Sequence, residues 1–151
     1  MGGDPHLEAT REMVKHLASL GVDLIEIGVP FSDPLADGPT IQEAGQRALK
    51  TTLAQLMELI REIRAEVAIP LLLMSYYNPI LNFGVERFAE TAAGAGVDGL
   101  IVPDMIPEEG GHLMAECKNR GVESILLFTP TSSDERMDYL AKMAGGFIYY
   151  V

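Results

Sequence analysis

Residues 23–39 read DLIEIGVPFSDPLADGP, and the class of fold can be inferred outward from this stretch. It joins an apolar, β-branched run, closed by Pro30, to a polar loop rich in Pro, Asp and Gly. Such a run between turn residues is typical of a buried strand in a parallel sheet. On both sides, over residues 8–20 and 53–67, apolar residues recur every three or four positions, which predicts amphipathic helices. The stretch therefore indicates an α/β protein.

The same alternation continues to the end of the chain. Strands are predicted over residues 23–29, 69–76, 99–102, 123–129 and 147–151, and helices over residues 8–20, 40–50, 53–67, 85–95, 108–119 and 134–143. Polar segments rich in Pro, Gly, Asp and Asn follow three of the strands, at residues 30–39, 78–84 and 103–107. Barrel enzymes build their sites in such loops, and the nucleotide-binding motifs GxGxxG and GxxxxGK[ST] are absent. We predict a partial (β/α)8 TIM barrel with about five parallel strands, forming one incomplete domain over residues 1–151.

Composition and charge exclude several partners. Lys and Arg number 11 against 22 Asp and Glu, so the net charge of −11 repels phosphate backbones and anionic lipids. No apolar run approaches the roughly 18 residues of a membrane span. The single cysteine, Cys117, fits a reducing compartment. We expect a soluble, cytoplasmic protein that binds neither nucleic acid nor membrane.

Glu26 is the most informative residue. The period of two in a strand places Ile25 and Ile27 on the helix-facing side and Glu26 on the opposite side, toward a barrel interior. Burial of a carboxylate there raises its pKa toward the range useful for proton transfer. The alternative is a structural pair with an interior Lys or Arg, but none of the predicted strands contains either residue.

Other acidic residues follow the strands. Asp33 and Asp37 by themselves are typical of turns, although Asp37 and Glu26 are spaced so that both could face one ligand. Asp104 could join them, and such a cluster could in principle hold a divalent metal, but we expect none. Tyr76 and Tyr149 fall in predicted strands, where core packing is the simpler interpretation.

Five segments carry a resemblance to a known family. They are GDP at 3–5, LIEIGVPFSDPLADGPTIQEA at 24–44, LLLMSYYNPILNFG at 71–84, AGVDGLIVPDMIPEE at 95–109 and TPTSSDER at 129–136. Together they resemble the tryptophan synthase α subunit. The resemblance implies a (β/α)8 barrel of which this chain corresponds to strands two to six, without the family's first strand and last two strand–helix units.

The resemblance also implies an activity and partners. The family cleaves indole-3-glycerol phosphate to indole and glyceraldehyde 3-phosphate, as a lyase of tryptophan biosynthesis, within an α2β2 heterotetramer. The β subunit carries pyridoxal phosphate, and no cofactor is expected in this chain. Because the phosphate-holding segments lie outside the resemblance, the 151 residues are expected to be inactive alone. The first alternative is a non-catalytic partial barrel that binds the β subunit. Another phosphate-handling barrel enzyme, such as an epimerase, ranks below it, because such enzymes lack the PFSDPLADGPT loop that this sequence contains.

Residue roles follow from the same resemblance. Glu26 matches the general acid/base, and Asp37 matches the carboxylate that binds the indole N–H. Residues that match the indole pocket are Tyr76, Ile101, Phe128 and Tyr149. Residues in loops that resemble the surface facing the β subunit are Pro30, Asp33 and Asn78.

Overall fold

The computed structural model describes all residues 1–151, and its strands form one parallel sheet. The elements in chain order are α1 (Leu7–Ser19), β1 (Ile25–Gly28), α2 (Pro39–Ala48), α3 (Leu53–Arg64), β2 (Leu71–Met74), α4 (Tyr77–Phe83), α5 (Val85–Ala95), β3 (Gly99–Ile101), α6 (Pro107–Lys118), β4 (Glu123–Phe128), α7 (Asp134–Met143) and β5 (Ile148–Tyr150). The strand order is β1-β2-β3-β4-β5, and every neighbouring pair is parallel. The prediction of five parallel strands with flanking helices is confirmed.

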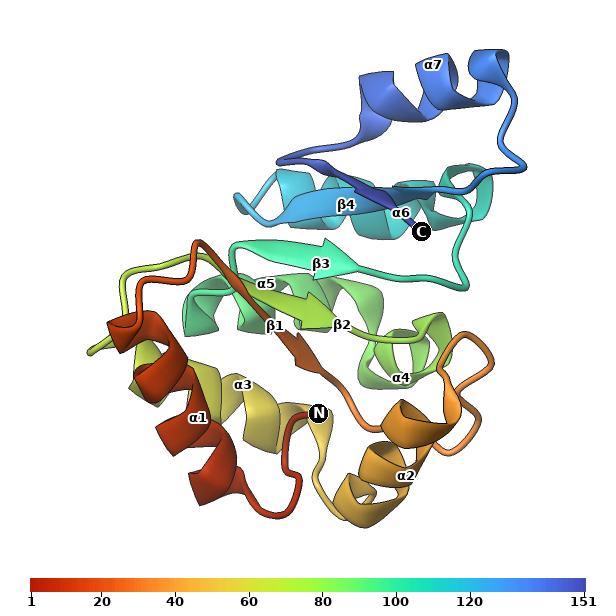
Figure 1. Cartoon of the computed structure of the whole chain (residues 1–151). Coiled ribbons are helices and arrows are strands. Elements are labelled where there is room, and N and C mark those ends of the chain that lie inside the picture. The colour runs from red at the N-terminus through yellow and green to blue at the C-terminus, as the bar shows by residue number, and fades with distance from the viewer.

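The main core lies between the sheet and the helices on one of its faces. Strand residues such as Ile27, Leu73 and Leu100 are buried against apolar residues of α1, α3, α5 and α6. These four helices lie side by side along this face of the sheet (Figure 1). A doubly wound sheet would carry helices on both faces and reverse its strand order, whereas this sheet does neither, as in the wall of a barrel.

The opposite face of the sheet carries a smaller apolar cluster of Leu72, Ile101 and Ile125. Gly99 leaves room for it. A Cβ at this position would lie 2.6 Å from Ile125 Cδ1 and 2.7 Å from Leu72 Cδ2. The strands therefore approach one another closely on this inner face, next to Glu26, whose register partner on β2 is Leu72.

One predicted loop is a helix. Asn, Pro and Gly in residues 78–84 indicated a loop, but Tyr77–Phe83 forms α4. Ile80 anchors this helix in the core, and the carboxylate of Asp104, from the loop after β3, accepts the Tyr77 N–H at 2.9 Å. Both contacts are tertiary, so local composition did not reveal them. In consequence, Tyr76 lies just after β2 rather than within the predicted strand.

The strands all end on one side of the sheet. In Figure 1 their arrows point to the right, where the β1–α2 loop, α2 and α4 lie. At the edge of β1, the Gly2 N–H donates to the Gly28 carbonyl at 2.9 Å, which brings the first residues of the chain beneath the same end. None of the helices has both the length and the apolar character that crossing a membrane requires.

Candidate active site

A cavity of about 360 Å³ opens at the carboxyl ends of β1 and β2. It lies between the strand ends, the β1–α2 loop and the start of α2. The side chains and backbone that line it come from Met1, Glu26, Gly28, Val29, Ala36, Asp37, Gly38, Ile41, Met74, Ser75, Tyr76 and Tyr149. The fold thus brings together four residues that the sequence singled out, Glu26, Asp37, Tyr76 and Tyr149, from segments as far apart as β1 and β5.

Glu26 projects from the inner face of β1. Its neighbours Ile25 and Ile27 are buried on the helix side, while Glu26 itself is half-buried at the cavity. Burial raises the pKa of the Glu26 carboxyl above its ordinary value, and no neighbouring charge contributes. The prediction of an inward carboxylate without a Lys or Arg partner agrees with this geometry. A carboxyl that is half-buried and has a raised pKa is suited to donate and accept a proton.

Asp37 enters the cavity on the loop between β1 and α2. Its N–H donates to the Pro34 carbonyl at 3.3 Å, and its own carbonyl accepts from Gln42 Nε2 at 2.8 Å. The preceding N–H, of Ala36, donates to the Tyr76 hydroxyl at 2.8 Å. The loop is therefore folded on itself and attached to the end of β2.

Tyr76 forms a wall of the cavity and is only 5% exposed. Its ring packs against Phe31, with 5.3 Å between the ring centroids. Burial raises the pKa of the Tyr76 phenol, the Ala36 N–H lowers it, and the negative charges of Asp37 and Asp104 raise it further. The phenol is therefore neutral and available as a hydrogen-bonding group.

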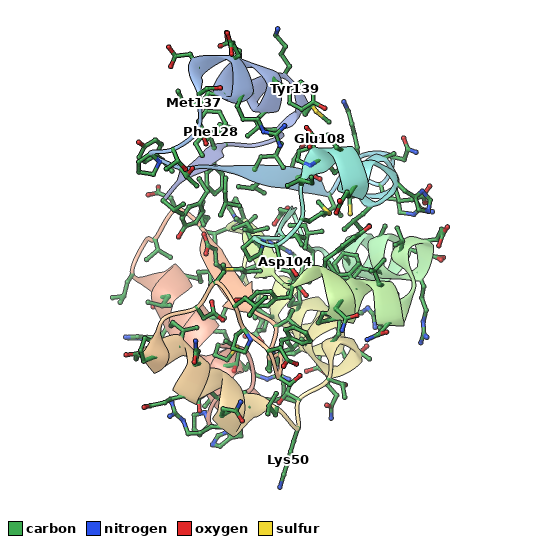
Figure 2. All side chains as sticks on the ribbon, turned by 90° about the vertical axis from the view of Figure 1, so that its right-hand side faces the viewer. Lys50, Asp104, Glu108, Phe128, Met137 and Tyr139 are labelled. Carbon is green, nitrogen blue, oxygen red and sulfur yellow. The ribbon has the colours of Figure 1, made fainter.

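Asp104 does not line the cavity with Glu26 and Asp37. Its carboxylate binds the Tyr77 N–H instead, and Figure 2, which faces the carboxyl ends of the strands, shows it near the middle of this side. No three His, Cys, Asp or Glu side chains gather closely enough to hold a metal ion. The possible three-carboxylate cluster is therefore not formed.

The remaining pocket predictions have different outcomes. Tyr149 lines the cavity, whereas Ile101 is fully buried in the inner cluster and does not reach it. Phe128 was expected at the pocket, but it packs with Leu126 and Leu140 on the helix-facing side of β4. Figure 2 shows it close to α7 and well away from Asp104. The reason is the period of two, which gives Phe128 the orientation of Leu126.

The residues expected to face a partner lie at the same end of the sheet. Pro30 is half-buried, and Asp33 and Asn78 are exposed. Leu35, between Asp33 and the cavity residues, is 90% exposed. Sequence reasoning did not single it out, although its place in the PFSDPLADGP segment was a signal.

Other lining residues were missed as well, among them Ile41, Ser75 and Met1. Ile41 lies in the first turn of α2, Ser75 follows β2, and Met1 lies under the cavity. The Met1 Sδ is 3.4 Å from the place that a Cβ on residue 28 would take, so Met1 packs against the end of β1. The position of Ile41 followed from the predicted helix, but nothing in the sequence pointed to Met1.

A parallel sheet with helices on one face is the wall of a TIM barrel, and the carboxylates and tyrosines lie at the carboxyl ends of its strands, where proteins of this fold class place their active sites. Comparison with known proteins narrows this class. The family model "Tryptophan synthase alpha chain" matches residues 1–151. The chain belongs to the tryptophan synthase alpha chain family, as its motifs predicted.

Individual relatives agree with this assignment. The tryptophan synthase alpha chain of Geotalea uraniireducens is 48% identical over 151 residues, which cover 99% of this chain and 57% of the relative. The crystal structure of the alpha chain from Legionella pneumophila superposes with a TM-score of 0.93 at 40% identity, covering 99% of this chain and 57% of that one. The tryptophan synthase complex from Pyrococcus furiosus gives 0.91 at 37% identity, covering 99% and 62%. The chain thus spans a little over half the length of these relatives.

Proposed function

We propose that residues 1–151 provide the proton-transferring part of a site that cleaves indole-3-glycerol phosphate to indole and glyceraldehyde 3-phosphate. The observation that carries the proposal is that Glu26, half-buried and without a charged partner, and Asp37 line one cavity at the carboxyl ends of the strands. Family membership supports the same reaction.

Glu26 is the proposed general acid and base. The cleavage adds a proton to the indole ring carbon that bears the glycerol chain. The carbon–carbon bond then breaks, its electron pair returns to the ring, and the adjacent hydroxyl loses its proton as the aldehyde forms. A carboxyl whose pKa is raised by burial can donate the first proton and accept the second.

Asp37 is the proposed partner of the indole N–H. Protonation of the ring carbon turns the indole into an indolenine and places positive charge on its nitrogen. A carboxylate held at this N–H stabilises the charge more in the transition state than in the ground state. The hydrogen bonds that fold the loop restrict the movement of Asp37 and so support this role.

The walls of the cavity suit a flat aromatic ligand. The rings of Tyr76 and Tyr149 and the side chains of Ile41 and Met74 supply apolar surface beside the two carboxylates. Apolar walls with a few convergent polar groups are typical of small-molecule sites. Ile101 lies beneath Met74 and Tyr149 and supports them. Phe128, on the other face of β4, does not contact the indole in this arrangement.

The proposed protein partner is a tryptophan synthase β subunit. A complex from Pyrococcus furiosus is among the similar structures. The exposed residues Asp33, Leu35 and Asn78, with Pro30, provide a surface for it at the end of the sheet where indole would be released. We place the pyridoxal phosphate of the complete reaction in that subunit, and the complex in the cytoplasm, where the thiol of Cys117 would stay reduced.

A second candidate function is binding of the β subunit without turnover. The exposed Leu35 favours it, because this side chain is 90% exposed and so is free to contact a protein partner whether or not cleavage occurs. The two functions differ in one observable: a binding module stimulates the β reaction but releases no indole.

The test uses a chimera in which residues 1–151 replace the matching segment of the full-length Geotalea uraniireducens relative. We expect the chimera to release indole and Glu26→Gln to lower the rate by at least about a hundredfold, as loss of a general acid or base does. Glu43→Gln, an exposed change on α2 outside the cavity, serves as the control. Indole release by the Glu26→Gln chimera at the control rate would exclude Glu26 as the acid/base, and an inactive chimera that stimulates the β subunit would favour the binding function.

A further inference from the structure

We propose that the Tyr76 hydroxyl positions the loop that carries Asp37, and that Asp104 in turn fixes Tyr76. The inference rests on the proposed function only in giving Asp37 a role toward the substrate. Neither the hydroxyl nor Asp104 needs to touch the reacting atoms, so both are positioning groups.

The first step is the hydrogen bond from the Ala36 N–H to the Tyr76 hydroxyl, at 2.8 Å. The other hydrogen bonds of residues 31–38 are local, as in the N–H of Leu35 to Asp33 and that of Asp37 to Pro34. The bond to Tyr76 is therefore the one hydrogen bond that attaches this loop to the end of another strand. It joins the loop at the residue directly before Asp37.

The second step is the packing around the same tyrosine. The Phe31 ring contacts the Tyr76 ring, so the start of the loop is held by the ring and its end by the hydroxyl. Because the hydroxyl oxygen accepts from Ala36, its proton remains available for donation. Asp37 is close enough for its charge to act on the phenol, and the cavity opens between them.

The third step leads from Tyr76 to Asp104. Tyr76 is the residue before the first turn of α4, and its side chain does not cap that helix. The carboxylate of Asp104 caps it instead by accepting the Tyr77 N–H at 2.9 Å. A hydrogen bond that a helix N–H donates to a charged acceptor is stronger than one donated to a neutral acceptor. Asp104 thus fixes the backbone beside Tyr76, and with it the direction of the ring.

A chain of contacts therefore runs from the β3–α6 loop through the start of α4 to the β1–α2 loop. Its consequence for catalysis is specific. If Asp37 acts mainly on charge that develops in the transition state, a displaced Asp37 lowers kcat more than it raises KM. A residue that merely supported the fold would lower the amount of folded protein and leave both constants of the folded fraction unchanged.

The first test measures amide hydrogen exchange in the 151-residue chain. Tyr76→Phe removes the hydroxyl and keeps the ring, and we expect the Ala36 amide to exchange about tenfold faster, as loss of one hydrogen bond predicts. Tyr77→Phe is the matched control, because the hydroxyl of Tyr77 binds no group of the protein whereas its N–H does. Unchanged exchange at Ala36 in Tyr76→Phe, or an equal change in Tyr77→Phe, overturns the proposal.

The second test measures indole release by the full-length chimera. We expect Tyr76→Phe to lower kcat about tenfold and to change KM less than about twofold. Asp104→Ala should act in the same direction, and Asp104→Asn, which retains an acceptor oxygen, should recover most of the rate. Equal rates for Asp104→Ala and the unsubstituted chimera overturn the role of Asp104.

A double substitution separates this inference from the proposed function. In an Asp37→Asn chimera, Tyr76→Phe should lower the residual rate by less than about twofold, because the group it positions has lost its charge. A further tenfold loss would show that Tyr76 acts independently of Asp37. Suppose that Glu26→Gln retains activity while Tyr76→Phe still speeds hydrogen exchange at the Ala36 amide. In that case the proposed function is wrong and the positioning role of Tyr76 stands.

Discussion

Arg64, the last residue of α3, forms an ion pair with Asp98, whose carboxylate also accepts the Leu71 N–H at 2.8 Å. The same guanidinium donates to the carbonyl oxygens of three further residues, Gly96, Val67 and Ile69. These groups lie where α3 and α5 end and where β2 and β3 begin. Arg64 therefore closes the amino end of the sheet, opposite the cavity.

Replacement of Arg64 by Met should destabilise the protein strongly. The change removes the guanidinium from three carbonyl oxygens and leaves Asp98 with the Leu71 N–H alone, and we expect the free energy of unfolding to fall by about 2–4 kcal/mol in denaturant titrations. Arg64→Lys should recover little, because an ammonium lacks the planar fork. Arg61→Met on the same helix removes an exposed pair with Glu58 and should cost less than about 1 kcal/mol. Similar losses for Arg64 and Arg61 would contradict this account.

Ionisation of Glu26 should lower the free energy of unfolding as the pH rises. Its folded pKa lies above the ordinary value of 4.5, so the folded protein holds this proton more tightly than the unfolded chain does. The favourable contribution is complete below 4.5 and is lost as the pH rises through the raised value. Relative to the unsubstituted chain, Glu26→Gln should gain thermal stability between about pH 4 and pH 8.

Glu108 provides a control of opposite sign. The hydrogen bond from Arg136 lowers the pKa of Glu108, so its contribution is present above 4.5 and disappears as the pH falls through the lowered value. Glu108→Gln should therefore be less stable than the unsubstituted chain at neutral pH and approach it in acid. If the difference in melting temperature from the unsubstituted chain changed with pH in the same direction in both variants, these assignments would be wrong.

Two Gly→Ala changes should have opposite effects. At Gly99, a methyl group meets Ile125 and Leu72 on the inner face, and we expect a loss of about 1–3 kcal/mol. At Gly111, an exposed position in α6, the methyl meets nothing within 4 Å and should add up to about 1 kcal/mol through helix propensity. Chemical denaturation of the two variants measures both values, and a neutral Gly99→Ala would show that the inner face is loosely packed.

The free edge of β5 should make the isolated 151-residue chain associate. No strand pairs with its outer side, and Phe147 just before the strand and Tyr150 at its end are 36% and 64% exposed. Sedimentation velocity should show dimers or larger species that Tyr150→Lys reduces. Tyr139→Lys, an exposed change on α7 rather than on β5, should leave association unchanged. A monomer at all concentrations would contradict the expectation.

Much of the architecture was evident from local patterns. Strands and helices bury one face at periods of two and 3.6 residues, so the order of elements and the inward direction of Glu26 could be inferred from neighbouring residues alone. The predicted helices agree with the structure to within a few residues. The pairing of Glu26 with Asp37 in one site followed from their places at a strand end and in the next loop.

Tertiary contacts determined the rest. α4 exists because Asp104 caps it and Ile80 is buried, although its composition indicated a loop. Phe128 turns away from the cavity because the pairing of Ile101 with Ile125 decides which face of β4 is inside. The bond between Ala36 and Tyr76 joins residues forty positions apart. Periodicity describes how each segment divides its own residues between two faces. Which face meets which neighbour depends on strand pairing and on packing between distant segments. Only the folded chain brings those segments together.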